Sequence, residues 1–360
     1  MAKKGVNGAN KRVYKHILIT GGAGFIGSNL ARHFLVKGIH VVIFDNFSRK
    51  GTDVNIKLLK RDFGTAFTVI RGDVVHDFKK LCAAVNAADA VIHLAAQVAV
   101  TTSVDNPRHD FETNAIGSFN VVEAVRLSKH QPPLIYSSTN KVYGSLKHRP
   151  VVEHDTHYRF EHEDIHANGI AETEQLDFHS PYGCSKGIAD QYVIDYSRVY
   201  GLKTVVFRQS CIYGPYQFGV EDQGWVAWFG IAALFNKKIT IYGNGKQVRD
   251  LLYINDLVRL YDLALQNIDT VSGHAYNVGG GPTNTLSLIK LLDMLEKRLG
   301  HPIDTHKAAI RVGDQPIFVA DIRKITNALG WAPQHGVDYG FDQMMNWIED
   351  HQELIAKALS

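Results

Sequence analysis

The chain has 360 residues, of which 45% are hydrophobic and 21% are charged, with a formal net charge of +3. This length predicts two domains, or one large domain with a smaller lobe, around a large buried core. The small net charge argues against a nucleic-acid-binding surface, and no apolar stretch is long enough to predict a membrane span.

The three cysteines, Cys82, Cys184 and Cys211, are widely spaced and odd in number. Because they include no C-x-x-C pair, they predict neither a disulfide framework nor a metal site. The basic residues near the start of the chain precede no apolar segment, so no secretion signal is expected. We therefore expect reduced thiols, a cytoplasmic location and no bound metal.

The first half of the chain alternates short β-rich runs with helical patterns. Strands are predicted at residues 16–20, 40–44, 67–71, 90–94, 134–138 and 204–208, with helices such as 24–36 and 114–128 between them. This alternation predicts an α/β fold with a doubly wound parallel sheet. Such sheets bind ligands outside the carboxyl ends of their strands, so the candidate site lies there.

A glycine-rich segment follows the first predicted strand and opens a helix. It reads Gly21-Gly22-Ala23-Gly24-Phe25-Ile26-Gly27. Gly21 and Gly24 allow a tight turn that approaches a pyrophosphate, and Gly27 allows the helix to pack closely against the strand. The N-terminus of the helix attracts the phosphates, so we predict a dinucleotide site.

Asp45 ends the second predicted strand, eighteen residues after Gly27. A carboxylate at this point accepts hydrogen bonds from the adenosine ribose and repels a 2′-phosphate, which favours NAD over NADP. Arg49 and Lys50 lie close by in sequence, and either of them would instead suit a 2′-phosphate. We give Asp45 the greater weight because it lies at the strand tip.

The ends of the next strands supply further candidate cofactor contacts. Asp73 suits the adenine amino group, although a turn or a helix cap explains it as well. The small residues after the fourth strand suit a closely approaching cofactor or simply tight packing. The full set at these strand ends is Asn46, Asp73, Val74, Leu94, Ala95, Ala96, Gln97 and Ser137.

The stretch 145–179 interrupts the alternation and is polar. It carries six histidines, at positions 148, 154, 157, 162, 166 and 179, but none shows the zinc-protease spacing with a glutamate. A surface loop that covers the active site is therefore favoured over a metal site. After residue 208 the alternation weakens, which indicates a smaller lobe that closes over the cofactor edge.

Tyr182 and Lys186 are four residues apart at the start of a predicted helix, so they share one face of it. A phenol with its ordinary pKa of about 10 is a poor base near neutral pH. The ammonium of Lys186 and the positive nicotinamide of NAD⁺ are expected to lower that pKa. Thr139, at the end of the fifth strand, can bridge the phenol and a substrate hydroxyl. We predict Thr139, Tyr182 and Lys186 as the catalytic set.

Together, the glycine segment, Asp45, Asn114, Thr139 and the Tyr182/Lys186 pair resemble the extended short-chain dehydrogenase/reductase family over about residues 15–346. The resemblance implies a Rossmann domain at 14–208, with a return segment at about 250–275. It also implies a smaller C-terminal α+β lobe at 209–249 and 276–360 that binds a nucleotide-sugar. Asn114 is then expected near the cofactor, and a homodimer is expected through the helices that carry Asn114 and Tyr182.

The residues after Thr139 and three longer strings indicate a branch of this family. Dehydratases have an Asp-Glu pair after the catalytic Thr, whereas this chain has Asn140 and Lys141, which disfavours elimination of water. The strings at 137–144, 176–186 and 222–225 resemble the CDP-tyvelose (CDP-paratose) 2-epimerases of the family. That likeness implies oxidation at sugar C2, rotation of a 2-keto intermediate and return of hydride to its other face, with NAD retained.

The resemblance also implies contacts to a nucleotide-sugar, expected to be CDP-linked. Arg249 and Arg311 resemble residues that meet the diphosphate or a ribose, although either would also suit a surface salt bridge. Cys211 stands where many relatives have an Asn that contacts the substrate. The expected substrate contacts are Thr139, Asn140, Gln209, Cys211, Gln223, Trp225, Arg249 and Arg311.

Other functions remain open from the sequence. A UDP-sugar 4-epimerase, or an enzyme acting on another unusual sugar, would use the same hydride chemistry at a different carbon. A dinucleotide-binding regulator without catalysis has no need of Thr139, Tyr182 and Lys186. A reductase that consumes NADPH conflicts with Asp45.

Overall fold

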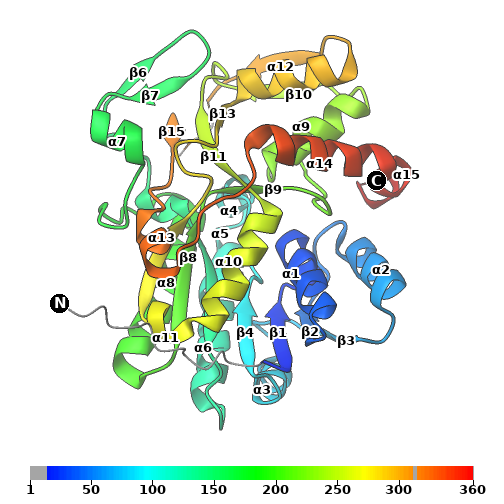
Figure 1. Cartoon of the computed structure of the whole chain (residues 1–360), viewed down its shortest axis with the longest axis vertical. Coiled ribbons are helices and arrows are strands. Elements are labelled where there is room, and N and C mark those ends of the chain that lie inside the picture. Colours follow the sequence, from blue (N-terminus) through cyan, green and yellow to red (C-terminus); the bar gives the residue numbers. More distant parts are fainter. Residues whose placement is uncertain (1–13, 311–313, 360) are drawn as a thin grey trace, which may run out of the picture.

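The computed structural model describes residues 14–310 and 314–359. Its centre is a seven-stranded parallel sheet with the order β12-β8-β5-β4-β1-β2-β3 (Figure 1). The strands are β1 His16–Thr20, β2 His40–Asp45, β3 Phe67–Arg71, β4 Ala90–His93, β5 Leu134–Thr139, β8 Thr204–Gln209 and β12 His274–Val278. This confirms the predicted α/β fold class, and β12 is a seventh strand beyond the six that the sequence pattern predicted.

The order of the strands reverses between β1 and β4, which lie side by side in the middle of the sheet. The loops that follow these two strands diverge to opposite sides, so a crevice forms at their carboxyl ends. β1 is buried on both faces, with Ile17, Leu18 and Ile19 all fully buried. Continuous apolar runs of this kind are typical of a parallel strand between two helical layers.

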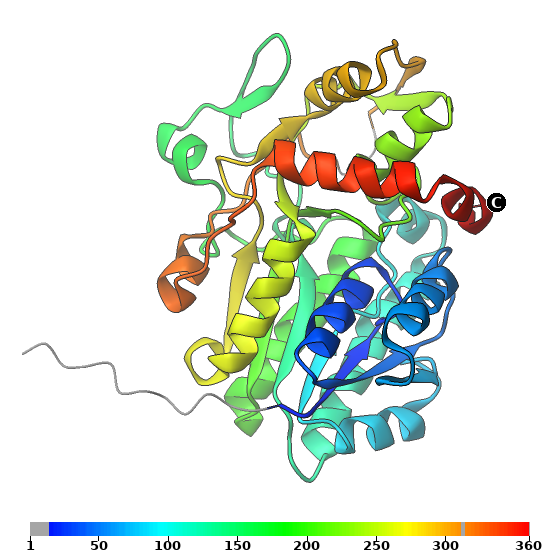
Figure 2. The same ribbon diagram turned by 45° about the vertical axis from the view of Figure 1, so that its right-hand side comes forward.

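Helices cover both faces of the sheet. On one face, α1 (Phe25–Val36) packs beside α10 (Ile254–Gln266), as both views show (Figures 1 and 2). On the other face lie α3 (Phe78–Asn86), α6 (Gly117–Leu127) and α8 (Ser180–Tyr200). Alternate strand residues divide between the layers, since Ile17 and Ile19 join the core under α1 and Leu18 joins the core under α6 and α8.

A second group of elements lies beyond the carboxyl ends of the sheet (Figure 1). Its strands are β9 Cys211–Tyr213, β10 Ile239–Tyr242, β11 Val248–Tyr253, β13 Thr285–Ser287, β14 Thr305–Ala308 and β15 Ile317–Phe318. Its helices include α9 Trp225–Leu234, α12 Leu288–Leu299, α14 Val337–Asp350 and α15 Gln352–Leu359. β11 pairs with β9, β13 and β15, so it ties three distant segments into one small sheet.

The histidine-containing stretch forms a hairpin, β6 (Val151–Glu153) with β7 (Tyr158–Phe160), followed by α7 (Glu163–Asn168). The hairpin is fixed to the turn after β10, because Asn244 donates to the Tyr158 hydroxyl at 2.7 Å and Lys246 pairs with Glu153 at 2.7 Å. Among the described residues, no three His, Cys, Asp or Glu side chains form a group suited to a metal ion. None of the described helices is long and apolar enough to cross a membrane.

Candidate active site

The glycine turn between β1 and α1 opens a cleft at the crevice of the sheet. Gly21 has a φ of 70°, and a Cβ on it would lie 2.6 Å from the backbone nitrogen of Ala95. A Cβ on Gly27 would lie 2.5 Å from the Cα of Gly22. No side chain caps α1 at Gly24. The turn therefore needs glycine to hold the N-terminus of α1 at the cleft, where a phosphate is stabilised by backbone amides and the helix dipole.

Most of the predicted cofactor contacts line this cleft. They are Gly21, Gly24, Phe25, Ile26, Gly27, Asp45, Asn46, Asp73, Val74, Leu94, Ala95, Ala96, Ser137, Tyr182 and Lys186. Gln97 and Asn114 are buried outside this lining, where the Asn114 amide exchanges hydrogen bonds of 2.9 and 3.0 Å with the backbone of Gln97. Their polar side chains stabilise the loop after β4 by these hydrogen bonds. The sequence pattern does not distinguish this structural role from contact with the cofactor.

Asp45 occupies the tip of β2, as the sequence predicts. Its carboxylate accepts hydrogen bonds from the backbone nitrogens of Ala23, at 3.0 Å, and Phe47, at 2.8 Å. Burial raises the pKa of Asp45, and these two hydrogen bonds oppose that rise. Beside it, Asn46 donates to Asp73 at 2.8 Å. The three polar side chains form one acidic end of the cleft, which suits ribose and adenine donors and disfavours an additional phosphate.

The three predicted catalytic side chains meet at the other end of the cleft. Tyr182 is 8% exposed, and the Thr139 side chain lies close enough to lower the pKa of its phenol. Lys186 lies one turn further along α8, where its ammonium donates to the Ser137 carbonyl at 2.6 Å and lies 4.3 Å from the centre of the Tyr136 ring. The sequence spacing therefore brings the phenol, the hydroxyl and the amine to one place.

Burial has the largest effect on the pKa of Tyr182. Burial raises the pKa of Tyr182 to about 12, while the Thr139 side chain and the Arg49 charge lower it. Burial also lowers the pKa of Lys186 to about 7, opposed by Asp190 and Asp110. Desolvation of the phenolate thus outweighs the positive charge that the protein supplies, and the lowering predicted from Lys186 together with NAD⁺ stays a prediction.

A buried ion pair holds the strand end behind the catalytic group. The Asp190 carboxylate accepts hydrogen bonds of 2.9 and 3.0 Å from Arg208 and one of 2.7 Å from the Ser138 hydroxyl. Arg208 also donates to the Tyr143 hydroxyl at 3.0 Å. Asp190 lies one turn after Lys186 on α8, so the ion pair fixes this helix against β8, and the Ser138 hydroxyl ties it to β5 next to Thr139.

His93 at the end of β4 yields a prediction of pH-dependent stability. It is buried between the Thr20 and Ser118 hydroxyls, at 2.6 and 2.9 Å, and burial lowers its pKa to about 3. The unfolded chain therefore takes up this proton below about pH 6.5 while the folded chain does not, so stability falls with falling pH. Between pH 7 and pH 5 we expect His93 to account for a loss of about 2 kcal/mol.

Urea unfolding of the wild type and of His93→Gln at both pH values checks this expectation. The difference in unfolding free energy between pH 7 and pH 5 should be about 2 kcal/mol smaller in the variant. Equal pH dependence in the two proteins would show that His93 is not the group responsible.

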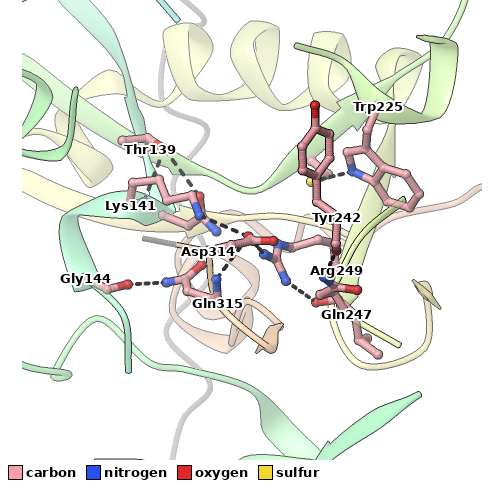
Figure 3. Close-up of polar contacts among 12 residues, drawn as sticks. Thr139, Lys141, Gly144, Trp225, Tyr242, Gln247, Arg249, Asp314 and Gln315 are labelled. Carbon is pink, nitrogen blue, oxygen red and sulfur yellow. Dashed lines mark hydrogen bonds and ion pairs between the residues drawn. The ribbon is translucent and has the colours of Figure 1, made fainter. Parts of the chain in front are cut away.

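A second polar cluster lies beyond Thr139, where β11 and the residues around Asp314 approach the short 3₁₀ turn Asn140–Tyr143 (Figure 3). Arg249 donates to the Asp314 carboxylate at 2.6 Å, and the Lys141 ammonium lies 3.8 Å from the same carboxylate. Burial and the Arg249 charge lower the pKa of Lys141 to about 8. Two cations thus converge beside the catalytic hydroxyl, an arrangement suited to an anionic substrate.

The other predicted substrate contacts divide between this cluster and other sites. The Trp225 indole donates to Cys211 Sγ at 3.4 Å, and Asn140 accepts from the Thr139 hydroxyl at 3.3 Å. Gln209 instead donates to the Tyr261 hydroxyl at 2.7 Å within the core. Gln223 lines the dinucleotide cleft, on the cofactor side of the site. Arg311 lies outside the described residues.

The comparisons with known proteins agree with this geometry. A family model described as GDP-mannose 4,6 dehydratase matches residues 18–344. The chain belongs to this family. It is a family of extended short-chain dehydrogenases/reductases, as the sequence motifs predicted.

Two relatives within the family cover nearly the whole chain. CDP-paratose 2-epimerase from Salmonella typhi is 47% identical over 338 residues, which are 92% of this chain and 98% of its own. A dTDP-glucose 4,6-dehydratase from Escherichia coli is 31% identical and covers 94% of each chain.

Solved structures of family members have the same architecture. UDP-glucuronic acid 4-epimerase from Bacillus cereus, in complex with UDP-glucuronic acid and NAD, superposes with a TM-score of 0.80 at 27% identity, covering 93% of this chain and 99% of its own. A dTDP-glucose 4,6-dehydratase from Streptomyces venezuelae with NAD bound also has a TM-score of 0.80, at 26% identity, covering 94% and 98%.

Sequence reasoning missed the residues that reach the cleft from the second group of elements. Four of them line the cleft beside α1 and α2: Tyr216, Gln217, Phe218 and Gly219. The sequence pattern marks Lys141 only as a departure from the dehydratase pair, although its side chain belongs to the cationic cluster. These residues approach the site from distant parts of the chain, and no local spacing marks such long-range contacts.

Proposed function

We propose that this chain is an NAD-dependent nucleotide-sugar epimerase that inverts C2 of a CDP-linked sugar. The observation that carries the proposal is the meeting of Thr139, Tyr182 and Lys186 at one end of the dinucleotide cleft, with two cations beyond them. The 47% identity to the Salmonella typhi CDP-paratose 2-epimerase supports the choice of nucleotide and of carbon.

The cleft residues fit NAD. Gly21 lets the turn lie against the backbone of Ala95, which any Cβ at this position would prevent. At the acidic end of the cleft, Asp45 with Asn46 and Asp73 suits an unphosphorylated ribose. NAD⁺, when bound, accepts a hydride from the sugar and returns it, and its nicotinamide adds a positive charge near the phenol. The cofactor is therefore regenerated in each cycle.

Tyr182 acts in this proposal as both base and acid. Its phenolate takes the proton of the C2 hydroxyl as the hydride leaves C2, which forms a 2-keto sugar. Thr139 holds the reacting oxygen through its hydroxyl, and Lys186 supports the negative charge from one turn away. After the 2-keto sugar rotates to present its opposite face, the phenol returns the same proton to the C2 oxygen while the hydride enters that opposite face of C2.

The residues after Thr139 favour epimerisation over dehydration. Elimination of water needs an acid and a base beside the sugar, which carboxyl groups supply in the dehydratase pattern. Asn140 and Lys141 supply an amide and an amine at those positions, and the Lys141 amine lies toward Asp314 (Figure 3). A 2-keto sugar at this site therefore has no neighbouring carboxylate from these two residues.

The substrate is proposed to span the two groups of elements. Arg249, with Lys141 beside it, faces the diphosphate, and Trp225 with Cys211 lies toward the nucleotide end. In this division, residues 14–208 with 250–275 hold the cofactor, and residues 209–249 with 276–360 hold the nucleotide-sugar. The cytoplasmic location stays a prediction.

A homodimer is proposed through the helices that precede and carry the catalytic residues. Phe111, Phe119 and Tyr192 are large side chains that are 48%, 40% and 46% exposed. They lie on α5 (Pro107–Phe111), α6 and α8, and the rings of Phe119 and Tyr192 pack together at 5.6 Å. An apolar surface shared by adjacent helices suits a self-complementary interface.

The test uses CDP-paratose deuterated at C2, incubated with the holoenzyme in ordinary water and followed by NMR. We expect CDP-tyvelose that keeps its deuterium at C2, because the same hydride leaves and returns inside the cleft. Loss of the label to water would indicate removal of C2–H as a proton and would contradict the proposal. Inversion of UDP-glucose at C4 with no action on CDP-paratose would establish the 4-epimerase alternative.

A further inference from the structure

Two loops from opposite groups of elements meet over the dinucleotide cleft. Arg49, between β2 and α2 (Thr52–Phe63), donates a hydrogen bond to the side-chain oxygen of Gln223, just before α9. The two residues are 174 positions apart in the chain, and both line the cleft. This contact joins two segments that line the same cleft.

The segment 215–223 is fixed in place by several further contacts. Asn29 of α1 donates to the Pro215 carbonyl at 3.1 Å, and the Arg32 guanidinium lies 4.1 Å from the centre of the Tyr216 ring. Gly51 lies so close to Phe218 that a Cβ on it would be 2.4 Å from the ring. The contact of Arg49 with Gln223 therefore joins two surfaces that are already packed together.

Arg49 lines the same cleft as Tyr182, and its charge lowers the pKa of the Tyr182 phenol. Burial lowers the pKa of Arg49, so its guanidinium is partly desolvated. Of the other cations that line the cleft, Lys186 binds the Ser137 carbonyl and Lys50 binds the Leu359 carbonyl, at 2.6 and 2.9 Å.

We propose that Arg49 and Gln223 form a clasp over the diphosphate of the bound dinucleotide and slow its release. The glycine turn at the N-terminus of α1 would hold the diphosphate, and the arginine fork would pair with its phosphate oxygens while Gln223 holds the guanidinium. The inference rests on the proposed function, in which the cofactor is regenerated and its release serves no step. It also assigns Arg49 to the diphosphate and not to a 2′-phosphate beside Asp45.

The experiment measures cofactor release directly. Holoenzyme loaded with radiolabelled NAD⁺ is diluted into excess unlabelled NAD⁺, and the label retained on the protein is followed over time. Arg49→Gln and Gln223→Leu should each release the label about tenfold faster or more, because each removes a charge-assisted hydrogen bond of the clasp. The double variant should be no faster than Arg49→Gln alone, since both residues act in one contact.

Arg61→Gln is the matched control, because Arg61 lies on α2 and pairs with Asp62 at the surface; its release should equal that of the wild type. Wild-type release rates in both Arg49→Gln and Gln223→Leu would overturn the clasp. So would an Arg49→Gln variant that changes only the pH profile of turnover, which would assign Arg49 to Tyr182 alone. A wild type that binds no NAD⁺ would instead refute the proposed function.

Discussion

Replacing Tyr182 with phenylalanine is expected to lower turnover by about 10²–10⁴-fold, the usual contribution of one acid–base group. The substitution removes only the hydroxyl, so the ring still fills its buried position on α8. The phenol that takes the proton of the sugar hydroxyl is then missing beside Thr139. The measurement is the rate of epimer formation at saturating substrate, with NAD content determined on the same preparation.

A matched control for this variant is Tyr200→Phe, at the exposed end of the same helix, where the ring is 49% exposed. Its turnover should equal that of the wild type. The Tyr182→Phe protein should keep its full complement of NAD, because the glycine turn and the acidic end of the cleft are untouched. Near-normal turnover in that protein would remove Tyr182 from the role of base.

Breaking the buried ion pair behind the catalytic group is expected to have the largest effect on stability. Asp190 is fully buried and the Arg208 side chain is 5% exposed. Asp190→Ala would leave the guanidinium buried without its carboxylate, which costs about 3–5 kcal/mol of unfolding free energy. Urea unfolding of the holoenzyme, with the same NAD concentration for both proteins, measures the loss.

The exposed pair of Arg198 and Asp195 on the same helix is the control, with side chains 74% and 53% exposed. Asp195→Ala should change the unfolding free energy by less than about 1 kcal/mol, because water screens the pair. Replacing both Asp190 and Arg208 with apolar residues should recover part of the loss, since no charge is then left unpaired. A loss at Asp190 no larger than at Asp195 would show that the Arg208 charge finds another partner.

The sheet could be predicted because its signal is local. The strands at 16–20 and 67–71 have the predicted bounds. β1 is a short apolar run covered on both faces, and β3 is a β-rich run at the edge of the sheet that is only partly buried. β12 escaped prediction because it carries His274, Tyr276 and Asn277 among its five residues. It forms a strand because it pairs with β8, a contact across 69 residues of sequence that no local pattern reveals.

The catalytic set could be predicted for the same reason. Tyr182 and Lys186 share a helix face by spacing alone, and Thr139 ends a recognisable strand. The pKa of Tyr182 could not be predicted, because its rise depends on burial by elements distant in sequence. One of them is helix α4 (Val100–Asp105), whose Ser103 hydroxyl accepts from the Tyr182 backbone nitrogen at 3.2 Å. The position of Gln223 likewise depends on its partner Arg49, 174 residues earlier.

The path of the chain between sheet and lobe has a consequence for how the molecule comes apart. After β8 the chain leaves the sheet for β9 to β11, returns for α10 and β12, leaves again for β13 and α12, and comes back to place α13 (Arg323–Leu329) against β12. No single cleavage therefore yields two independent halves. The cofactor-binding part and the substrate-binding part should unfold together in one cooperative step. A substitution that destabilises either part should therefore lower the unfolding free energy of the whole chain.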